Sequence, residues 1–82
     1  MSDILIGKVE RVERLGHTYY GNPMHRVALN YRLPGETEFH YGIFRVSNNA
    51  MINYEISNAE FRNDFHEFHL TKAGRIAFAR NV

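Results

Sequence analysis

The chain has 82 residues and no cysteine, and its ten basic and nine acidic side chains give a formal net charge of +1. This length predicts one domain spanning residues 1–82, and the lack of cysteine excludes disulfides, a thiol nucleophile and thiolate metal sites. Near-neutral charge argues against a protein that coats nucleic acid by electrostatics alone, and an aromatic content of 13% argues against disorder.

The first segment, residues 4–15, admits two interpretations. As a strand it is rich in β-branched residues, and its alternation slips between Val9 and Val12, as a β-bulge would cause. As a helix it would place Leu5, Val9 and Val12 on one face, but Gly7 inside that helix would cost about 1 kcal/mol. The strand is the favoured interpretation.

Residues 25–46 predict a β-hairpin. The first arm alternates between a polar row and an apolar row, the latter made of Val27, Leu29, Tyr31 and Leu33. Pro34 and Gly35 supply the turn. The returning arm, residues 38–46, carries bulky side chains on both faces, which predicts a central strand.

Residues 47–64 break the strand pattern. Ser57 and Glu60 fit a capping box, which predicts a short helix over residues 58–63. Ser47 would cap another turn that runs through Met51. Residues 52–56 alternate and are compatible with a short extended piece instead.

The last segment, residues 65–82, predicts a second hairpin that turns at Ala73 and Gly74. One face of its first arm carries His66, Phe68 and Leu70. The matching face of its second arm is predicted to carry Ile76, Phe78 and Val82.

The predicted order is therefore three strands, a helix and two strands, which is the order of an OB-fold. The predicted fold class is mainly β, a small five-stranded OB-like barrel. An SH3-like barrel is the alternative, because the helix is short and weakly signalled. Closure into a barrel would also protect the sheet edges.

Catalytic and metal-binding patterns are weak. A zinc site needs converging ligands, and His66 and His69 would point to opposite faces of a strand; solvent-facing or edge histidines are the simpler interpretation. Ser47 and Ser57 resemble helix caps and lie in no nucleophile-elbow pattern. The carboxylates alternate with arginines, as on a solvated face. We therefore expect no enzymatic activity, no cofactor and no metal.

The glycine- and proline-bounded segment at residues 14–27 would join the first two strands. Its aromatic and sulfur side chains either form an exposed binding rim or fold back to plug the barrel end. Arginines on the second and third strands lie next to it in this interpretation. The candidate binding residues are Tyr19, Tyr20, Met24, Arg26, Arg32, Tyr41 and Arg45.

Tyrosines beside arginines are typical of protein-binding hot spots and of platforms for single-stranded nucleic acid. The charge balance favours a non-catalytic module that binds protein, either a host protein or a second copy as a homodimer. Binding of single-stranded DNA or RNA across the second and third strands is the alternative. Capture of a small ligand or metal at the histidines is a third possibility.

Three stretches of the chain are similar in sequence character to a known group of proteins. They are residues 6–29 (IGKVERVERLGHTYYGNPMHRVAL), 52–63 (INYEISNAEFRN) and 74–82 (GRIAFARNV). In these it resembles small accessory proteins of tailed bacteriophages. The resemblance implies a protein of the host cell cytoplasm, without disulfides, that acts by binding. Separately, residues 1–14 have too few consecutive apolar residues for a signal peptide or a membrane span, so we expect no membrane partner. It transfers no functional residues, because no defining motif carries it.

Overall fold

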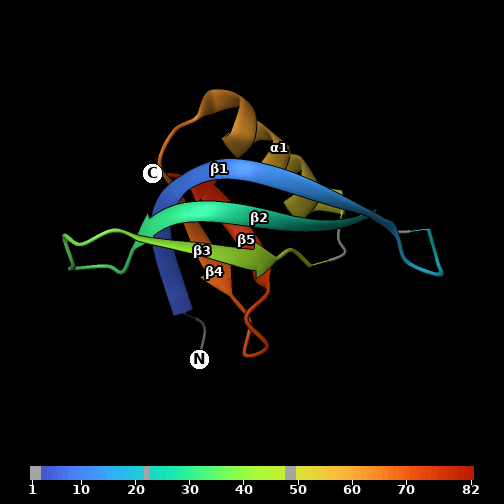
Figure 1. Ribbon diagram of the computed structural model, residues 1–82, viewed down its shortest axis with the longest axis horizontal. Helices are drawn as coiled ribbons and strands as arrows, with labels where there is room; N and C mark the ends of the chain where they lie inside the picture. Colours follow the sequence, from blue (N-terminus) through green and yellow to red (C-terminus); the bar gives the residue numbers. More distant parts are fainter. Residues whose placement is uncertain (1–2, 22, 48–49) are drawn as a thin grey trace.

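A computed structural model describes residues 3–21, 23–47 and 50–82. Its elements in chain order are β1 (Asp3–His17), β2 (Pro23–Arg32), β3 (His40–Arg45), α1 (Ala50–Arg62), β4 (His66–Leu70) and β5 (Ile76–Asn81). The strands form one antiparallel sheet in the order β3-β2-β1-β4-β5, with β1 in the centre (Figure 1). The predicted mainly-β class and the predicted order of strands and helix are confirmed.

The sheet is not closed into a barrel. Its two edges, β3 and β5, meet through one parallel bridge between Val46 and Ile76, where the Ser47 N–H donates to the Ile76 carbonyl at 2.9 Å. The prediction that β3 is a central strand is wrong. The large side chains on its outward side, Tyr41 and Ile43, are exposed. Large side chains on both faces of this strand therefore did not mean that both faces are buried.

Strand β1 is long and strongly curved (Figure 1). It contributes to both layers of the molecule, one formed with β2 and β3 and the other with β4 and β5. Its pairing with β2 shifts between Val9 and Arg11, which leaves Glu10 as an extra residue in a β-bulge. At Gly7 an added Cβ would lie 2.3 Å from the Asn30 carbonyl oxygen, so only glycine permits this close approach. The strand interpretation and the predicted bulge are both confirmed.

The hydrophobic core lies between β1–β3, β4–β5 and α1. The predicted inward residues Val27, Leu29, Phe68 and Leu70 are buried, whereas Leu33 lies beyond β2 and is exposed. His66 is also buried, and its Nδ1 donates to the Asp64 carbonyl at 3.0 Å. The prediction that His66 shares a face with Phe68 and Leu70 is confirmed, whereas the interpretation of the histidines as solvent-facing or edge residues is wrong for His66.

Helix α1 begins earlier than predicted and includes residues 52–56. Ser57 and Glu60 lie inside it rather than at its start, because Ile52, Ile56 and Ala59 recur at helical spacing and bury one face in the core. The predicted cap at Ser47 depends on residues 48–49, which lie outside the described residues. In the described part of the chain, no helix has the length and apolar character needed to cross a membrane.

The turns form where glycine allows a positive φ: Gly35 has φ 83° and Gly74 has φ 79°, as predicted. In β5 the pairing skips a residue, since Leu70 pairs with Ile76 and His69 with Phe78. This irregularity turns Phe78 outward and Ala79 inward. The predicted inward row of Ile76, Phe78 and Val82 is therefore wrong beyond its first member.

Candidate binding surface

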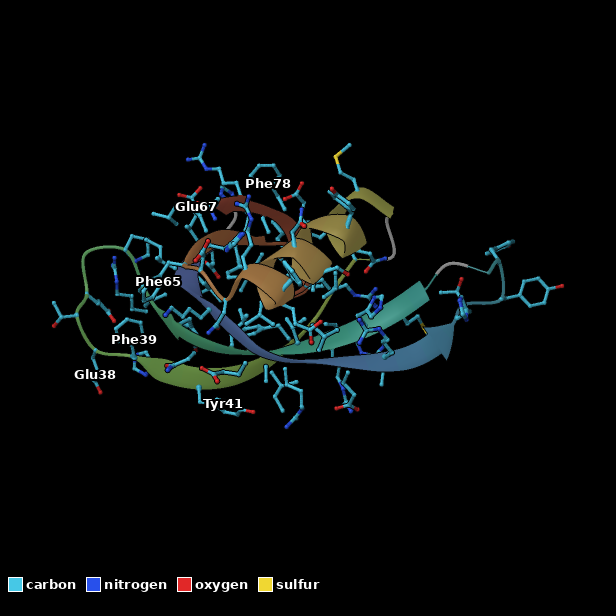
Figure 2. The ribbon with its side chains drawn as sticks, turned by 90° about the horizontal axis from the view of Figure 1, so that it is seen from above. Glu38, Phe39, Tyr41, Phe65, Glu67 and Phe78 are labelled. Atoms are coloured by element: carbon cyan, nitrogen blue, oxygen red, sulfur yellow. The ribbon has the colours of Figure 1, made fainter. Side chains whose placement is uncertain are left out.

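We define the outer face as the side of β1, β2 and β3 that is turned away from α1. The cross-strand register places Arg26 opposite Arg45 and Asn30 opposite Tyr41. Figure 2 shows Tyr41 directed away from α1, and its side chain is 61% exposed. Four of the predicted binding residues therefore share this surface: Arg26, Arg32, Tyr41 and Arg45.

Positive charge is concentrated on the outer face. Alternation along the strands places five basic side chains there against two acidic ones; they are Lys8, Arg11, Arg26, Arg32 and Arg45, with Glu10 and Glu13. Arg26 forms an ion pair with Glu13 and holds the pKa of that carboxyl below its usual value, through a hydrogen bond and its charge. Arg11 and Arg45 are exposed and have no ion pair with any described residue.

A recess opens at the end of the outer face where the β2–β3 loop approaches β4. The Phe39 and Phe65 rings lie 6.1 Å apart between centroids, and Figure 2 shows the two side chains near each other at this end of the molecule. The Lys8 ammonium lies 4.8 Å from the centre of the Phe65 ring, a cation–π contact. The recess has a volume of about 410 Å³ and is lined by Lys8, Glu10, Asn30, Phe39, Asn63 and Phe65.

The β1–β2 loop carries the other predicted aromatic residues and projects from the opposite end of the molecule (Figure 1). Tyr19 and Tyr20 are 97% and 87% exposed, and their rings meet edge to face at 5.3 Å between centroids. They do not plug the barrel end, which was one of the two expectations. Met24 is half-buried on β2.

The seven predicted residues do not form one site. Tyr41 lies opposite Asn30, seven residues along β2 from the strand's beginning at Pro23. At a rise of about 3.3 Å per residue, this separates Tyr41 from the loop end of β2 by roughly 23 Å. The outer face and the tyrosine loop are therefore two separate candidate surfaces.

The recess residues Phe39, Phe65 and Lys8 were not among the predicted binding residues. A signal was present for Phe65, because the inward row of His66, Phe68 and Leu70 implied an outward row on the same arm. No local pattern could place Phe65 beside Phe39. Their contact arises because β1 pairs with β2 on one side and β4 on the other.

The exposed side of β4 and β5 differs electrostatically from the outer face of β1–β3. The Glu67 carboxylate accepts hydrogen bonds from His69 Nε2 at 2.6 Å and from Arg80 Nε at 3.0 Å. These two partners, His69 first, lower the pKa of Glu67. The His69 ring also meets Phe78 edge to face at 5.1 Å. Figure 2 shows Glu67 and Phe78 on the opposite side of the molecule from Tyr41.

The histidines are dispersed, and each of the three that are most enclosed has a hydrogen-bond partner within the chain. His25 Nδ1 lies 2.7 Å from the Asn53 side-chain oxygen, His66 contacts Asp64, and His69 contacts Glu67. Within the described ranges, no three histidine or carboxylate side chains gather in a way that could hold a metal ion.

No protein family matches the chain, and neither does any curated protein or solved structure. Any functional conclusion must therefore come from the surfaces themselves.

Proposed function

We propose that the outer face of β1–β3 binds single-stranded DNA or RNA. One observation carries this proposal: the exposed Tyr41 ring shares the outer face of the strands with five basic side chains and two acidic ones. Single-strand binders combine rings on which bases stack with cations that contact the phosphates. The near-neutral net charge of the whole chain argues only weakly against nucleic-acid binding, because the basic side chains are concentrated on the outer face.

Each part of the outer face has a separate role in this proposal. Bases stack on Tyr41 and Phe39, whose rings are substantially exposed. Arg45 and Arg11 contact phosphates, since neither forms an ion pair with a carboxylate of the described residues; the Arg11 charge acts on Glu13 without a direct ion pair. Arg26 contributes less because Glu13 already binds its guanidinium group. Bases in a duplex are already stacked on one another, so these rings favour a single strand.

We also propose that the fold is a partly open OB-like barrel rather than an SH3-like one. The helix between β3 and β4 and the parallel bridge from Val46 to Ile76 support this assignment. In OB-folds the face of the second and third strands is the usual region for oligonucleotide binding. The proposed fold and the proposed surface are thus consistent with each other.

Fluorescence anisotropy with an oligothymidylate of about 12 nucleotides tests the proposal. We expect affinity to fall steeply as salt increases, and Arg45→Ala to make the slope of log affinity against log salt shallower by about 0.7. Arg80→Ala is the matched control, because Arg80 is an exposed arginine on the other outer face and is paired with Glu67. Absence of binding at low salt, or an equal effect of both variants, overturns the proposal.

A second candidate function, binding of a protein partner, is favoured by the tyrosine loop. Two tyrosines exposed this fully at the tip of a loop offer a large contact area with few torsions to immobilise. A second copy of the chain or a host protein would dock there. The loop is separate from the outer face, so both functions can coexist.

Sedimentation velocity over a range of concentrations, together with a nuclease-treated pull-down, tests this candidate. We expect either a dimer or a captured protein that is lost when Tyr19 and Tyr20 are both changed to Ser. Tyr54→Ser, at an exposed position on α1, is the control. A monomer that captures no protein after nuclease treatment contradicts protein binding.

A further inference from the structure

We propose that the recess lined by Phe39 and Phe65 holds one unstacked guanine base and gives the protein a preference for guanine. This inference rests on the proposed binding of single-stranded nucleic acid and names the base that the recess would select. The recess volume of about 410 Å³ lies within the range of roughly 300–1,000 Å³ usual for small-ligand sites. It opens on the outer face and so lies on the path of a strand that crosses Tyr41.

Three local irregularities build the recess. The bulge in β1 gives Glu10 no Cα partner on β2, and bulges often re-aim a side chain in this way. Asn63 ends α1 with φ 56°, in the left-handed region, and its N–H donates to the Ala59 carbonyl at 3.0 Å. Asparagine tolerates this conformation better than most residues. The β2–β3 loop supplies Phe39. Together these features aim polar side chains beside aromatic ones.

The aromatic part of the recess suits a base but does not discriminate between bases. The Phe39 and Phe65 rings are inclined at 42° to each other, so they do not form a closed parallel stack. Both rings remain partly exposed and offer a face on which a base can stack. Lys8, held over Phe65, is positioned to contact the phosphate of the same nucleotide. These contacts fit any nucleotide.

Discrimination comes from the polar lining. The Watson–Crick edge of guanine carries two adjacent donors, N1–H and N2–H, followed by the O6 acceptor. The Glu10 carboxylate can accept from both donors, and a carboxylate accepts in pairs only where two donors are adjacent. The side-chain amides of Asn30 and Asn63 can donate to O6.

The other bases match this lining less well. Adenine and cytosine present a ring-nitrogen acceptor beside their amino group, and a carboxylate repels that acceptor. Thymine and uracil have one N–H between two acceptors. Glu10 forms no ion pair with any residue that the structure describes, so its oxygens are available to a ligand.

Oligothymidylates in which one central thymine is replaced by guanine, hypoxanthine, adenine or cytosine test the inference. We expect the guanine oligonucleotide to bind about tenfold more tightly than the others, as one or two additional hydrogen bonds to a charged group would give. Hypoxanthine retains N1–H and O6 but lacks the N2 amino group. It should therefore lose most of the preference. This comparison uses the unmodified protein and does not depend on the folding of any variant.

Two variants assign the preference to a residue. Glu10→Gln replaces one acceptor oxygen with an amide donor and should bring the guanine ratio close to one, while binding of plain oligothymidylate persists. Glu38→Gln, in the neighbouring β2–β3 loop but outside the recess lining, should retain the preference. A preference that survives Glu10→Gln overturns the role of Glu10.

The outcomes separate the two proposals. If oligothymidylate binds but guanine gives no gain, the inference about the recess is overturned while the proposed function stands. If no oligonucleotide binds at low salt, the proposed function itself fails.

Discussion

The two outer surfaces of this sheet contain the same kinds of residue but differ in charge compensation. On β4–β5, Glu67 engages both His69 and Arg80, and His69 covers part of Phe78. On β1–β3, Glu13 forms an ion pair with Arg26 and also interacts with the charge of Arg11, whereas Arg45 has no carboxylate partner in the described ranges. Aromatic residues and arginines alone therefore do not make a binding surface. What distinguishes the two surfaces is how many of the cations are already neutralised within the chain.

The largest expected effect removes the support that both surfaces share. Phe68 is fully buried between the two layers, and Phe68→Ala should lower the free energy of unfolding by about 3–5 kcal/mol. Urea denaturation followed by circular dichroism measures this loss. Phe78→Ala, at a partly exposed position on β5, is the control and should cost much less. Equal losses in the two variants would contradict the description of the core.

The next largest effect tests whether bases stack on the outer face of β1–β3 rather than elsewhere on the molecule. Tyr41→Ala should weaken oligothymidylate binding by about 1–3 kcal/mol, the usual loss for one base–aromatic stack. Tyr54→Ala is a close control, because Tyr54 on α1 is 66% exposed and Tyr41 is 61% exposed. Isothermal titration or anisotropy measures both variants. A similar weakening in both would point to nonspecific adhesion rather than to the outer face.

A smaller effect should follow from changing charge compensation directly. Glu13→Gln removes the carboxylate that engages Arg26, so that arginine becomes available to a phosphate. We expect tighter binding and a steeper salt dependence, by about 0.7 in the slope of log affinity against log salt. Glu67→Gln releases Arg80 on the other surface and should leave the slope unchanged. Tighter binding in Glu67→Gln alone would place the nucleic acid on β4–β5 instead.

The smallest effect concerns acid stability. The pKa values of Glu13 and Glu67 are both lowered from the ordinary 4.5. The folded state therefore takes up these protons less readily than the unfolded state. The resulting stabilisation is complete above the ordinary value and is lost as pH falls through the lowered one.

Urea midpoints measured from neutral pH down to about pH 3 should show this loss. The profile should be flatter in Glu67→Gln than in Glu13→Gln. The Glu67 side chain is only 20% exposed and has two partners, whereas the Glu13 side chain is 40% exposed and has one. A profile unchanged in Glu67→Gln would show that its partners contribute nothing to acid stability.

Much of the fold could be predicted from local patterns. The slipped alternation near Val9 marked the bulge, and Gly35 and Gly74 marked the two turns. The errors arose where tertiary contacts overrode a local signal. Ser57 resembled a helix cap but lies within α1, because the apolar face containing Ile52 and Ile56 extends the helix toward its N-terminus. Phe78 resembled a core residue until an irregular pairing turned it outward.

The candidate site was predictable only in part, for the same reason. Arg26, Arg32, Tyr41 and Arg45 were placed on the second and third strands by alternation, and they do share a face. Tyr19 and Tyr20 were grouped with them because they are near in sequence, although β2 separates them from Tyr41 along its length. The recess needed a contact between Phe39 and Phe65, which no spacing in the chain reveals.

The sequence by itself determined the strands, the turns and the inward faces of the first, second and fourth strands, because these depend on side-chain period and on the backbone freedom of glycine. Only the tertiary structure decided which cations remain unpaired and which aromatic rings meet. Those properties depend on strand order and register, which bring Glu13 to Arg26 and Glu67 to Arg80 across neighbouring strands, and Phe39 to Phe65 from separate hairpins.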